Sequence, residues 1–256
     1  MSFLREVLAS RKRDIEEAKR HAPREDRRPA LEDRRDFAAA LRGGSPAIVA
    51  EIKRASPSAG FIAHASPAEL TRAYEAAGAS AISVVTEPRW FGGRLDDLGA
   101  ARAACPLPIL RKDFITDEYQ IEESALAGAD AVLLIVAALD QSSLKGLRAL
   151  AESLGLCALV EVHDEAEAAR ALDAGASLVG VNNRDLHSLA VDLTTALRVR
   201  RVLPAGIVTV AESGYQNGDQ LRACYEAGFD AVLVGEALLR AQDPKTLLRS
   251  LRGVPA

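Results

Sequence analysis

Apolar residues along this chain come in short, regularly spaced runs that predict strands. These runs fall near residues 47–53, 81–86, 108–112, 131–136, 157–162, 178–182, 207–212 and 231–235. Runs of four to six apolar residues are typical of strands buried on both faces of a parallel sheet. Helical patterns lie between most neighbouring runs, for example over residues 67–77, 142–154 and 165–174. Eight strands alternating with helices, at a spacing of about 25 residues, predict an α/β protein with a (β/α)8 TIM barrel.

A short internal repeat supports the barrel. Ala-Gly followed by Ala or Phe and then Ser or Asp occurs at residues 77–80, 127–130, 174–177 and 227–230, at intervals of 50, 47 and 53. Each glycine follows an expected helix, where a left-handed C-cap favours glycine, and the next strand begins at once. The interval corresponds to two β/α units. An open doubly wound sheet is the alternative, and the lack of a dinucleotide-binding fingerprint disfavours it.

The first 44 residues follow a different pattern and predict extra N-terminal helices. Apolar side chains recur with charges between them over residues 1–20, at Phe3, Leu4, Val7, Leu8 and Ile15, which indicates an amphipathic helix. A charged connector over residues 21–36 follows, which could be disordered. A second short helix is expected before Gly43. We therefore expect one domain over residues 1–256, with a helical extension over 1–44 and the barrel over 45–256.

Composition and charge narrow the function classes. Hydrophobic residues make up 48% of the 256 residues, enough for one large core, and aromatic residues only 4%, so aliphatic side chains must fill the interior. A net charge of −4 and a pI of about 5.7 disfavour a general nucleic-acid binder. No apolar stretch reaches about 18 residues and the N-terminus is charged, so the sequence predicts neither a membrane span nor a signal peptide.

Cysteine and histidine usage indicates a reducing compartment. Cys105, Cys157 and Cys224 are odd in number and have no CxxC spacing. They fit buried thiols in a reducing cytosol better than disulfides or zinc ligands. The four histidines are scattered, with no HExxH motif. We therefore expect a soluble cytoplasmic protein without a metal site.

Five of the apolar runs end in charged or amide side chains. These are Glu51 with Lys53, Lys112, Glu161, Asn182 and Glu212. A charge at the C-terminal end of such a strand has left the core and reached the rim, where α/β folds place their chemistry. Two lysines and three glutamates that arrive there together predict a site that handles protons and anions.

Glu51 and Lys53 lie two residues apart on one strand, so their side chains project to the same face. In the mouth of a barrel they could pair with each other. The alternative is a surface salt bridge, which contributes little. Lys112 and Glu161 at other strand ends favour the functional interpretation, because buried charges persist only when they are paired or employed.

Three loops carry groups that could hold an anion. Residues 56–58 (Ser-Pro-Ser) follow Lys53, and hydroxyl and backbone N–H groups beside a lysine can bind phosphate or carboxylate. An ordinary proline turn would leave the same pattern. Residues 212–215 (Glu-Ser-Gly-Tyr) and 234–236 (Val-Gly-Glu) end the seventh and eighth strands, where barrels often bind phosphate. The glycines there allow close approach of a ligand, or serve only to make a tight turn.

Other loop residues are weaker candidates. Trp90, Phe91 and Phe114 could stack on a planar substrate, although such residues more often cap the outer core. Residues 182–185 (Asn-Asn-Arg-Asp) supply amide and guanidinium donors after the sixth strand. The second Asn and the Asp of that segment could equally form a turn.

Together these segments resemble the indole-3-glycerol phosphate synthase family of tryptophan biosynthesis. The resemblance runs from about residue 3 to about residue 250 and includes the N-terminal helices. The matching stretches are E-I-K-R-A-S-P-S at 51–58, L-R-K-D-F at 110–114, V-E-V at 160–162, N-N-R-D-L at 182–186, A-E-S-G at 211–214 and G-E-A-L at 235–238. The first two stretches together are highly specific to this family.

The resemblance implies a reaction and roles for its residues. The family converts 1-(2-carboxyphenylamino)-1-deoxyribulose 5-phosphate into indole-3-glycerol phosphate with release of CO₂ and water, and it uses no cofactor or metal. Lys112 looks like the family's acid for ring closure. Lys53 resembles the lysine that meets the substrate carboxylate and protonates the departing hydroxyl, although the division of acid duty stays open. Glu161 looks like the general base that restores aromaticity, and Glu51 and Glu212 look like partners of the lysines.

The resemblance also implies how the substrate is held. Asn182 resembles the residue that hydrogen-bonds the hydroxylated chain. The remaining expected substrate contacts are Ser56, Gly214, Gly235 and Glu236 at the phosphate, Phe91, Phe114, Pro57 and Leu133 around the anthranilate ring, and Arg184 and Ser213 beside them. Glu236 stands where family members often carry serine. Its carboxylate would repel phosphate unless the side chain turns away.

Two other functions fit part of the pattern. A phosphate-binding aldolase would form a Schiff base on Lys112, but the carboxylates that accompany the lysines favour a protonated acid. A barrel that only binds a phosphorylated metabolite would not need both lysines and Glu161. We expect a monomer with a phosphorylated small-molecule substrate, no nucleic-acid or membrane partner, and at most transient contact with other tryptophan-pathway enzymes.

Overall fold

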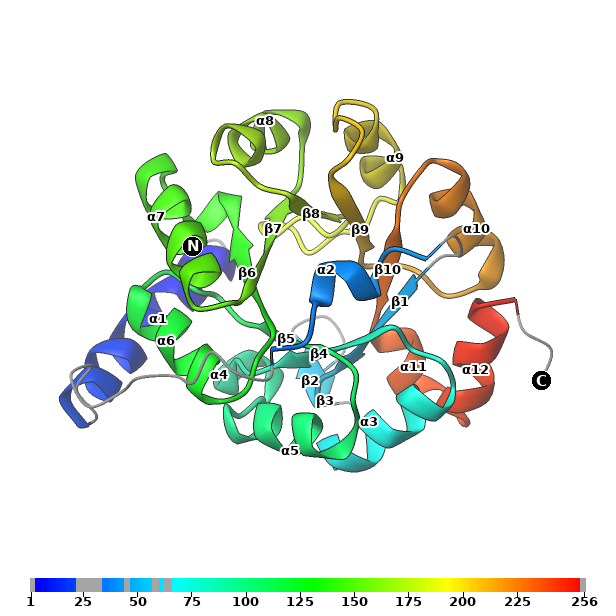
Figure 1. Cartoon of the computed structure of the whole chain (residues 1–256), viewed down its shortest axis with the longest axis horizontal. Helices are drawn as coiled ribbons and strands as arrows, with labels where there is room; N and C mark the ends of the chain where they lie inside the picture. The colour runs from blue at the N-terminus through cyan, green and yellow to red at the C-terminus, as the bar shows by residue number, and fades with distance from the viewer. Residues whose placement is uncertain (1–2, 22–33, 44–46, 57–59, 62–65, 254–256) are drawn as a thin grey trace.

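Eight parallel strands form one closed barrel in the order β1-β10-β9-β8-β7-β6-β5-β4 (Figure 1). The structure, a computed structural model, describes residues 3–21, 34–43, 47–56, 60–61 and 66–253. The strands are β1 (Ala47–Ile52), β4 (Ala81–Val85), β5 (Ile109–Lys112), β6 (Ala131–Ile135), β7 (Cys157–Val162), β8 (Leu178–Asn182), β9 (Val208–Glu212) and β10 (Ala231–Val234). The first and last residues of each strand lie within one residue of the bounds expected from the sequence. The predicted TIM barrel is therefore confirmed.

Helices follow the strands and cover the outside of the barrel. The longer ones are α3 (Pro67–Ala76), α5 (Asp96–Ala104), α6 (Glu118–Leu126), α7 (Gln141–Ser153), α8 (Glu165–Asp173), α9 (Thr194–Arg200), α10 (Gly218–Glu226) and α12 (Pro244–Leu251). Shorter elements lie in the loops: the hairpin β2 (Ala55–Ser56) and β3 (Gly60–Phe61), α4 (Pro88–Phe91), the 3₁₀ helix η2 (Val136–Ala138) and α11 (Glu236–Arg240). The expected helices over 67–77, 142–154 and 165–174 are confirmed.

The Ala-Gly repeat has the conformation that its position predicts. Gly78, Gly128, Gly175 and Gly228 have φ angles of 90°, 88°, 81° and 91°. Each ends the helix that precedes β4, β6, β8 and β10 in turn. A side chain is strained in this left-handed region, which explains glycine at these turns.

Side chains on each strand alternate between two apolar regions. On β1, Val49 belongs to the cluster inside the barrel, whereas Ile48 and Ile52 belong to the layer between the barrel and its helices. This alternation follows from the two-residue period of a strand. Glu51 and Lys53 share the inward register of Val49. The packing of apolar residues therefore directs these two charges into the barrel.

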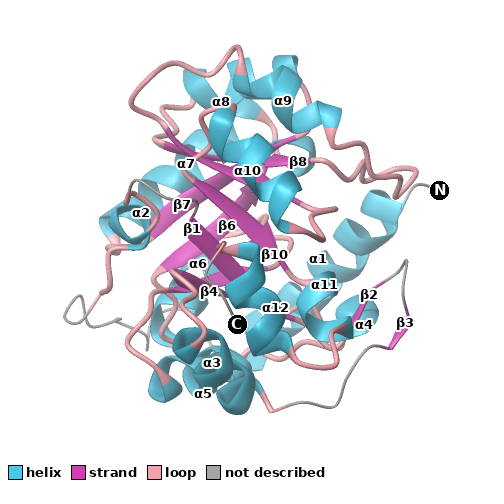
Figure 2. Ribbon diagram, turned by 90° about the vertical axis from the view of Figure 1, so that its right-hand side faces the viewer, coloured by secondary structure: helices cyan, strands magenta, loops and turns pink. Residues whose placement is uncertain are grey.

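The two N-terminal helices lie at opposite ends of the barrel (Figure 2). The short helix α2 (Phe37–Ala40) places Phe37 and Leu41, both fully buried, in the cluster inside the barrel, and so closes the end where the strands begin. Helix α1 (Phe3–His21) reaches the end where the strands finish, and Phe3 packs edge-on against Phe114 with ring centroids 6.4 Å apart. The connector predicted over 21–36 lies outside the described residues from 22 to 33.

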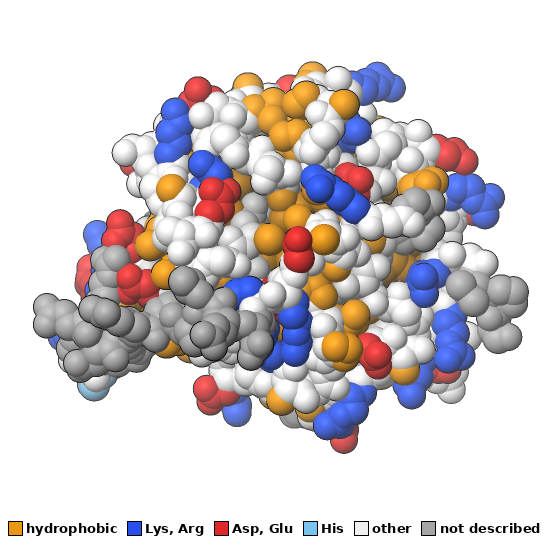
Figure 3. All heavy atoms as spheres, in the orientation of Figure 1, with side chains coloured by type: hydrophobic (Ala, Val, Ile, Leu, Met, Phe, Trp, Pro, Cys, Tyr) orange, Lys and Arg blue, Asp and Glu red, His pale blue; other side chains and the backbone are white. Residues whose placement is uncertain are grey.

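The surface agrees with the mixed charge of the sequence. On the face seen in Figure 3, the described basic and acidic side chains are interspersed and do not separate into large patches of one sign. No helix in the described parts of the chain is long and apolar enough to cross a membrane.

Asp130 ties the N-terminal segment to the closed end of the barrel. Its carboxylate is fully buried and accepts hydrogen bonds from the backbone N–H groups of Arg35 and Ile109, both at 2.9 Å. It also accepts a bond from Nη1 of Arg102 at 2.8 Å. A buried charge with this set of partners is costly to remove, because its partners would lose their acceptor.

We expect Asp130→Ala to lower the free energy of unfolding by about 3 kcal/mol, since two backbone N–H groups lose their acceptor and the guanidinium of Arg102 loses its counter-charge. Urea denaturation measures this loss. Because Asp130 lies at the end of the barrel where the strands begin, kcat at a permissive temperature should stay unchanged. The exposed Asp219→Ala serves as the control, and a stable Asp130→Ala variant would contradict the assignment.

Candidate active site

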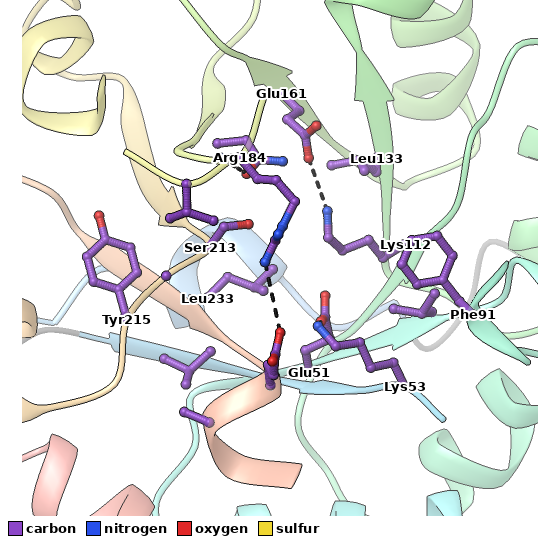
Figure 4. A pocket seen from close by; sticks show the side chains of 18 of the residues that line it. Glu51, Lys53, Phe91, Lys112, Leu133, Glu161, Arg184, Ser213, Tyr215 and Leu233 are labelled. Atoms are coloured by element: carbon purple, nitrogen blue, oxygen red, sulfur yellow. Dashed lines mark hydrogen bonds and ion pairs between the residues drawn. The ribbon is translucent and has the colours of Figure 1, made fainter. Parts of the chain in front are cut away.

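The carboxyl ends of the strands surround a cavity of about 690 Å³. Figure 4 shows charged side chains from β1, β5 and β7 that converge on it. Thirteen of the sixteen residues expected from the sequence line this cavity: Glu51, Lys53, Phe91, Lys112, Phe114, Leu133, Glu161, Asn182, Arg184, Ser213, Gly214, Gly235 and Glu236. Glu212 lies directly behind Lys112, which it contacts. Residues up to 185 positions apart in the chain (Glu51 to Glu236) therefore share one space.

Lys112 points into the cavity because its neighbours point away from it. Arg111 and Asp113 face the outer layer, where Nη2 of Arg111 lies 3.0 Å from the Asp113 carboxylate. Nη2 of Arg11, on α1, lies 2.9 Å from the same carboxylate. Burial raises the pKa of Asp113, but the two guanidinium groups outweigh it and lower the pKa overall. This ionised network anchors the end of β5 and leaves Lys112 as the inward residue.

Lys112 is held between two buried carboxylates. Its Nζ lies 3.0 Å from Oε2 of Glu161 and 3.2 Å from Oε2 of Glu212. Each of these glutamate side chains is only 1% exposed. Burial lowers the pKa of Lys112, but the carboxylates of Glu161, Glu212 and Glu51 raise it further, so the ammonium form is favoured. The site therefore holds a proton donor that is charged before substrate arrives.

The two carboxylates differ in their protonation. Burial raises the pKa of Glu161, but Lys112 and His163 outweigh it and hold that pKa well below its usual range. For Glu212, burial and the negative charge of Glu161 exceed the effect of Lys112 and raise the pKa to about 7. Because like charges at close range cannot both ionise freely, one glutamate stays ionised and the other titrates near neutral pH.

Glu51 and Lys53 form the pair that their spacing predicts. Nζ of Lys53 donates to Oε1 of Glu51 at 2.6 Å, and the Lys53 and Glu51 side chains are 13% and 4% exposed. The alternative of a surface salt bridge is therefore wrong. Both side chains line the cavity (Figure 4).

Two glycines make room for the buried carboxylates. A Cβ atom at Gly180 would collide with Oε1 of Glu212, and one at Gly235 would collide with Oε1 of Glu51. A close approach of this kind requires glycine irrespective of backbone torsion. The glycine in the run Leu-Val-Gly-Val-Asn on β8 therefore has a reason that hydrophobic patterning alone did not reveal.

One wall of the cavity is apolar. Phe91 and Phe114 lie with ring centroids 6.4 Å apart, and Leu133 is almost fully buried beside them. Trp90 instead packs edge-on against Phe3, with centroids 6.0 Å apart. Trp90 packs against the cluster inside the barrel and is not among the residues that line the cavity, whereas the two phenylalanines are.

The opposite wall carries polar groups and an unusual main chain. Ser213 and Gly214 have φ angles of 66° and 90°, so a non-glycine residue adopts the left-handed region next to the cavity. Such strain is stored at functional sites more often than elsewhere. Glu236 lies between two guanidinium groups, 3.0 Å from Nε of Arg240 and 3.9 Å from Nη2 of Arg184. The negative charge of its carboxylate is therefore balanced by two nearby guanidinium groups.

Some expected residues do not join the site in the described structure. Pro57 and the side chain of Ser56 lie outside the described residues. Asn183 is a structural residue: its amide donates to the hydroxyl of Tyr215 at 2.9 Å. Asp185 accepts bonds from the backbone N–H groups of residues 187 and 188, which confirms its turn-forming alternative. Among the described residues, no group of three or more His, Cys, Asp or Glu side chains is arranged to hold a metal ion.

Among the residues that sequence reasoning did not assign to the site, Phe3, Arg240 and His163 stand out. Phe3 and Arg240 line the cavity, and His163 contacts Glu161 from behind. Nothing in the spacing of Phe3 predicts that α1 reaches the barrel mouth. His163 lies two residues after Glu161, so the rule that paired Glu51 with Lys53 could have found it.

A closed (β/α)8 barrel with an ammonium clamped by carboxylates at its mouth defines a class of enzymes that perform acid–base chemistry on anionic substrates. Over residues 4–251 the chain matches the family model described as indole-3-glycerol phosphate synthase. The chain therefore belongs to the indole-3-glycerol phosphate synthase family, whose members are carboxy-lyases of tryptophan biosynthesis.

Similar proteins support this assignment over most of the chain. An indole-3-glycerol phosphate synthase of Parafrankia sp. (strain EAN1pec) is 49% identical over 255 residues, which cover 98% of this chain and 95% of that protein. One from Mycolicibacterium vanbaalenii is 55% identical over 217 residues, or 84% and 80% of the two chains. Indole-3-glycerol phosphate synthase 2 of Streptomyces coelicolor is 53% identical over 220 residues, or 86% and 85%.

Solved structures support the fold alone. The thiamine phosphate pyrophosphorylase of Pyrococcus furiosus superposes with a TM-score of 0.62 at 20% identity, over 83% of this chain and 96% of that one. A 3-hexulose-6-phosphate synthase superposes with a TM-score of 0.64 at 20% identity, over 82% and 100%.

The raised pKa of Glu212 predicts a pH-dependent stability. Its carboxyl keeps a proton up to about pH 7 in the folded chain but titrates near 4.5 when free. The folded state therefore binds more protons than the unfolded state in that window, and the stability of the wild type falls as pH rises through it. The free energy of unfolding of Glu212→Gln, minus that of the wild type, should therefore be about 2 kcal/mol larger at pH 8 than at pH 5. Urea denaturation at both pH values measures this, with the exposed Glu69→Gln as control; parallel profiles for wild type and Glu212→Gln would contradict it.

Proposed function

We propose that this chain closes the indole ring of indole-3-glycerol phosphate by general acid–base catalysis in the cavity at the barrel mouth. The substrate is 1-(2-carboxyphenylamino)-1-deoxyribulose 5-phosphate. The observation that carries the proposal is the position of Lys112, charged and held within 3.2 Å of both Glu161 and Glu212 in a cavity large enough for a small phosphorylated molecule.

The lining of the cavity fits the three chemical parts of this substrate. Phe91, Phe114 and Leu133 offer an apolar slot for the aromatic ring. Lys53 also lines the cavity, and we assign it to the ring carboxylate. Asn182 and the segment around Ser213 and Gly214, together with Gly235 and Arg184, supply donors for the hydroxylated chain and its phosphate.

Ring closure needs an acid, which we assign to Lys112. The ring carbon that bears the carboxylate attacks the C2 carbonyl with a π electron pair of the ring. The carbonyl π pair moves to oxygen, which takes a proton from the Lys112 ammonium. Loss of CO₂ then returns the electron pair of the broken bond to the ring and restores its aromaticity. A proton donor already charged in the empty site needs no proton uptake before this step.

Dehydration needs an acid for the departing hydroxyl and a base for the C1 proton. We assign the acid to Lys53, whose proton leaves with the hydroxyl as water. Glu161 removes a proton from the former C1 methylene, which completes the pyrrole ring. Glu161 lies 3.0 Å from Lys112 and can return that proton to the now neutral amine. Two protons supplied and one removed leave a net uptake of one, which matches the conversion of a carboxylate into neutral CO₂.

The surroundings of Lys112 disfavour the aldolase alternative. A Schiff base forms only from a neutral amine, which enzymes obtain through desolvation or a neighbouring cation. Here the nearest charges are carboxylates, which stabilise the ammonium form. Borohydride treatment in the presence of substrate should therefore leave Lys112 unmodified.

We also propose that the protein works in the cytoplasm as a monomer whose ligand is the phosphorylated substrate, without a nucleic-acid or membrane partner, and with only transient contacts to other tryptophan-pathway enzymes. Cys105, Cys157 and Cys224 are free, which suits a reducing compartment. The net charge of −4 and the interspersed surface charges offer no attraction for polyanions.

Lys112→Ala should lower kcat by ~10²–10⁴-fold, because ring closure loses its acid. Affinity for the product indole-3-glycerol phosphate, measured by calorimetry, should change little, since the phosphate contacts are intact. Lys145→Ala is the matched control, because it removes an exposed lysine paired with Asp173 at 2.9 Å. Unchanged kcat in Lys112→Ala would remove Lys112 from the mechanism.

The wild type should form fluorescent indole-3-glycerol phosphate from its substrate at an undiminished rate after dialysis against EDTA, because the proposed steps use side chains alone. A fluorescence assay follows the product directly. Loss of activity on chelation, with recovery on addition of a divalent cation, would overturn the metal-free mechanism. Binding of the substrate without product would instead favour a barrel that only binds it.

A further inference from the structure

His163 stands between two carboxylates at the end of β7. Its Nε2 lies 3.3 Å from Oε1 of Glu161, and its Nδ1 lies 3.0 Å from Oε2 of Glu167 on α8. The backbone N–H of His163 donates to the same oxygen of Glu167 at 2.8 Å. The side chain is only 13% exposed. An imidazole with both ring nitrogens facing carboxylates is held as imidazolium, and the pKa of His163, although burial lowers it, is raised to about 10.

Glu161 is therefore held by a different cation on each oxygen. Oε2 faces Lys112, and Oε1 faces His163. Neither Nε2 of His163 nor Oε1 of Glu161 has a hydrogen-bond partner elsewhere in the described structure. The contact between them is an ion pair at 3.3 Å. Asn182 is a further, uncharged side-chain partner of Glu161.

The two cations have different fates during the proposed reaction. Lys112 gives up its proton at ring closure and becomes neutral, so it no longer fixes Glu161 by charge. His163 takes no part in that step, and Glu167 keeps it charged. Glu161 must then hold its position until it removes the C1 proton, and a displacement of about 1 Å at that point can cost ~10²-fold in rate.

We propose that His163 is a positioning residue that fixes the Glu161 carboxylate for proton removal after Lys112 has become neutral. The inference rests on the proposed role of Glu161 as the base. Glu167 acts through His163, because its carboxylate orients the ring and holds the imidazolium charge, as a carboxylate does behind other functional histidines.

A purely structural role is the competing explanation. Through Glu167, His163 could merely fasten the first turn of α8 to the end of β7. The two explanations differ in which ring nitrogen is needed: positioning of Glu161 needs Nε2, whereas fastening of α8 needs Nδ1. In the variant His163→Gln, the side-chain amide nitrogen would occupy about the position of Nε2 and reach Glu161. In His163→Asn, the shorter side chain would place its amide nitrogen at about the position of Nδ1, where it reaches Glu167 instead.

The test measures kcat and KM for His163→Ala, His163→Asn and His163→Gln with the full chain. Positioning predicts that kcat falls ~10–100-fold in the Ala and Asn variants, with KM changed less than about threefold, and that Gln recovers most of the loss. Arg198→Ala is the matched control, since it removes an ion pair with Glu165 on the same first turn of α8 (2.7 Å) and leaves Glu161 untouched. Better recovery by Asn than by Gln would overturn the proposal.

An isotope effect identifies the affected step. In the variants with reduced kcat, substrate deuterated at both C1 positions should react more slowly than unlabelled substrate, because removal of that proton has become limiting. Equal rates for the two substrates would show that another step was impaired and would overturn the proposal. So would an unchanged kcat in His163→Ala.

The double variant His163→Ala/Glu167→Gln separates the role of Glu167. It should be no slower than His163→Ala alone, since Glu167 acts only through the ring.

The variant Glu161→Gln tells a failure of the proposed base apart from a failure of the positioning role of His163. If it retains full activity, the proposed function of Glu161 is wrong; if it is inactive while the His163 variants behave as wild type, only the positioning role is wrong.

Discussion

The site depends on one constraint: a lysine ammonium has to stay charged beside two glutamate side chains that are almost fully buried. Burial alone would favour the neutral amine, and the barrel counters it with the ionised carboxylate of Glu161 and, above about pH 7, that of Glu212, both within 3.2 Å of Nζ. Removing a charge of either sign would leave its neighbours uncompensated in a medium of low dielectric constant. Lysine and glutamates therefore act as one unit.

The closed barrel meets this constraint because it brings distant strand ends together at fixed spacing. Lys112 and Glu212 are the last residues of β5 and β9, and Glu161 is the last but one of β7. These are alternate strands of the barrel, whose inward side chains share a layer. Gly180, on the strand between the two glutamates, leaves the space that the carboxylate of Glu212 occupies. Asp113 and its guanidinium partners hold β5 from outside. Residues that look from the sequence like ordinary core or turn residues therefore help to hold the charged side chains in place.

Much of the fold and the cluster followed from the sequence because two periodicities determine both. The run Ile-Leu-Arg-Lys-Asp showed where β5 ends, and strand alternation placed Glu51 and Lys53 on one face. The contact of Arg184 with Glu236 did not follow, because it comes from packing between elements. The reach of α1 to the barrel mouth, where Phe3 meets Phe114, depends on a docking geometry that its amphipathic pattern does not specify.

Glu236 shows how such packing changes the meaning of a residue. From sequence, a carboxylate beside the expected phosphate position is unfavourable. In the structure Arg240 and Arg184 both face it, so the three side chains together carry a net charge of +1. An incoming phosphate would meet this net charge and could share the guanidinium groups with Glu236. The glutamate also keeps both guanidinium groups near the cavity before the ligand arrives, which lowers the entropy lost on binding. A glutamate at position 236 is thus compatible with an anion site, provided that the arginines accompany it.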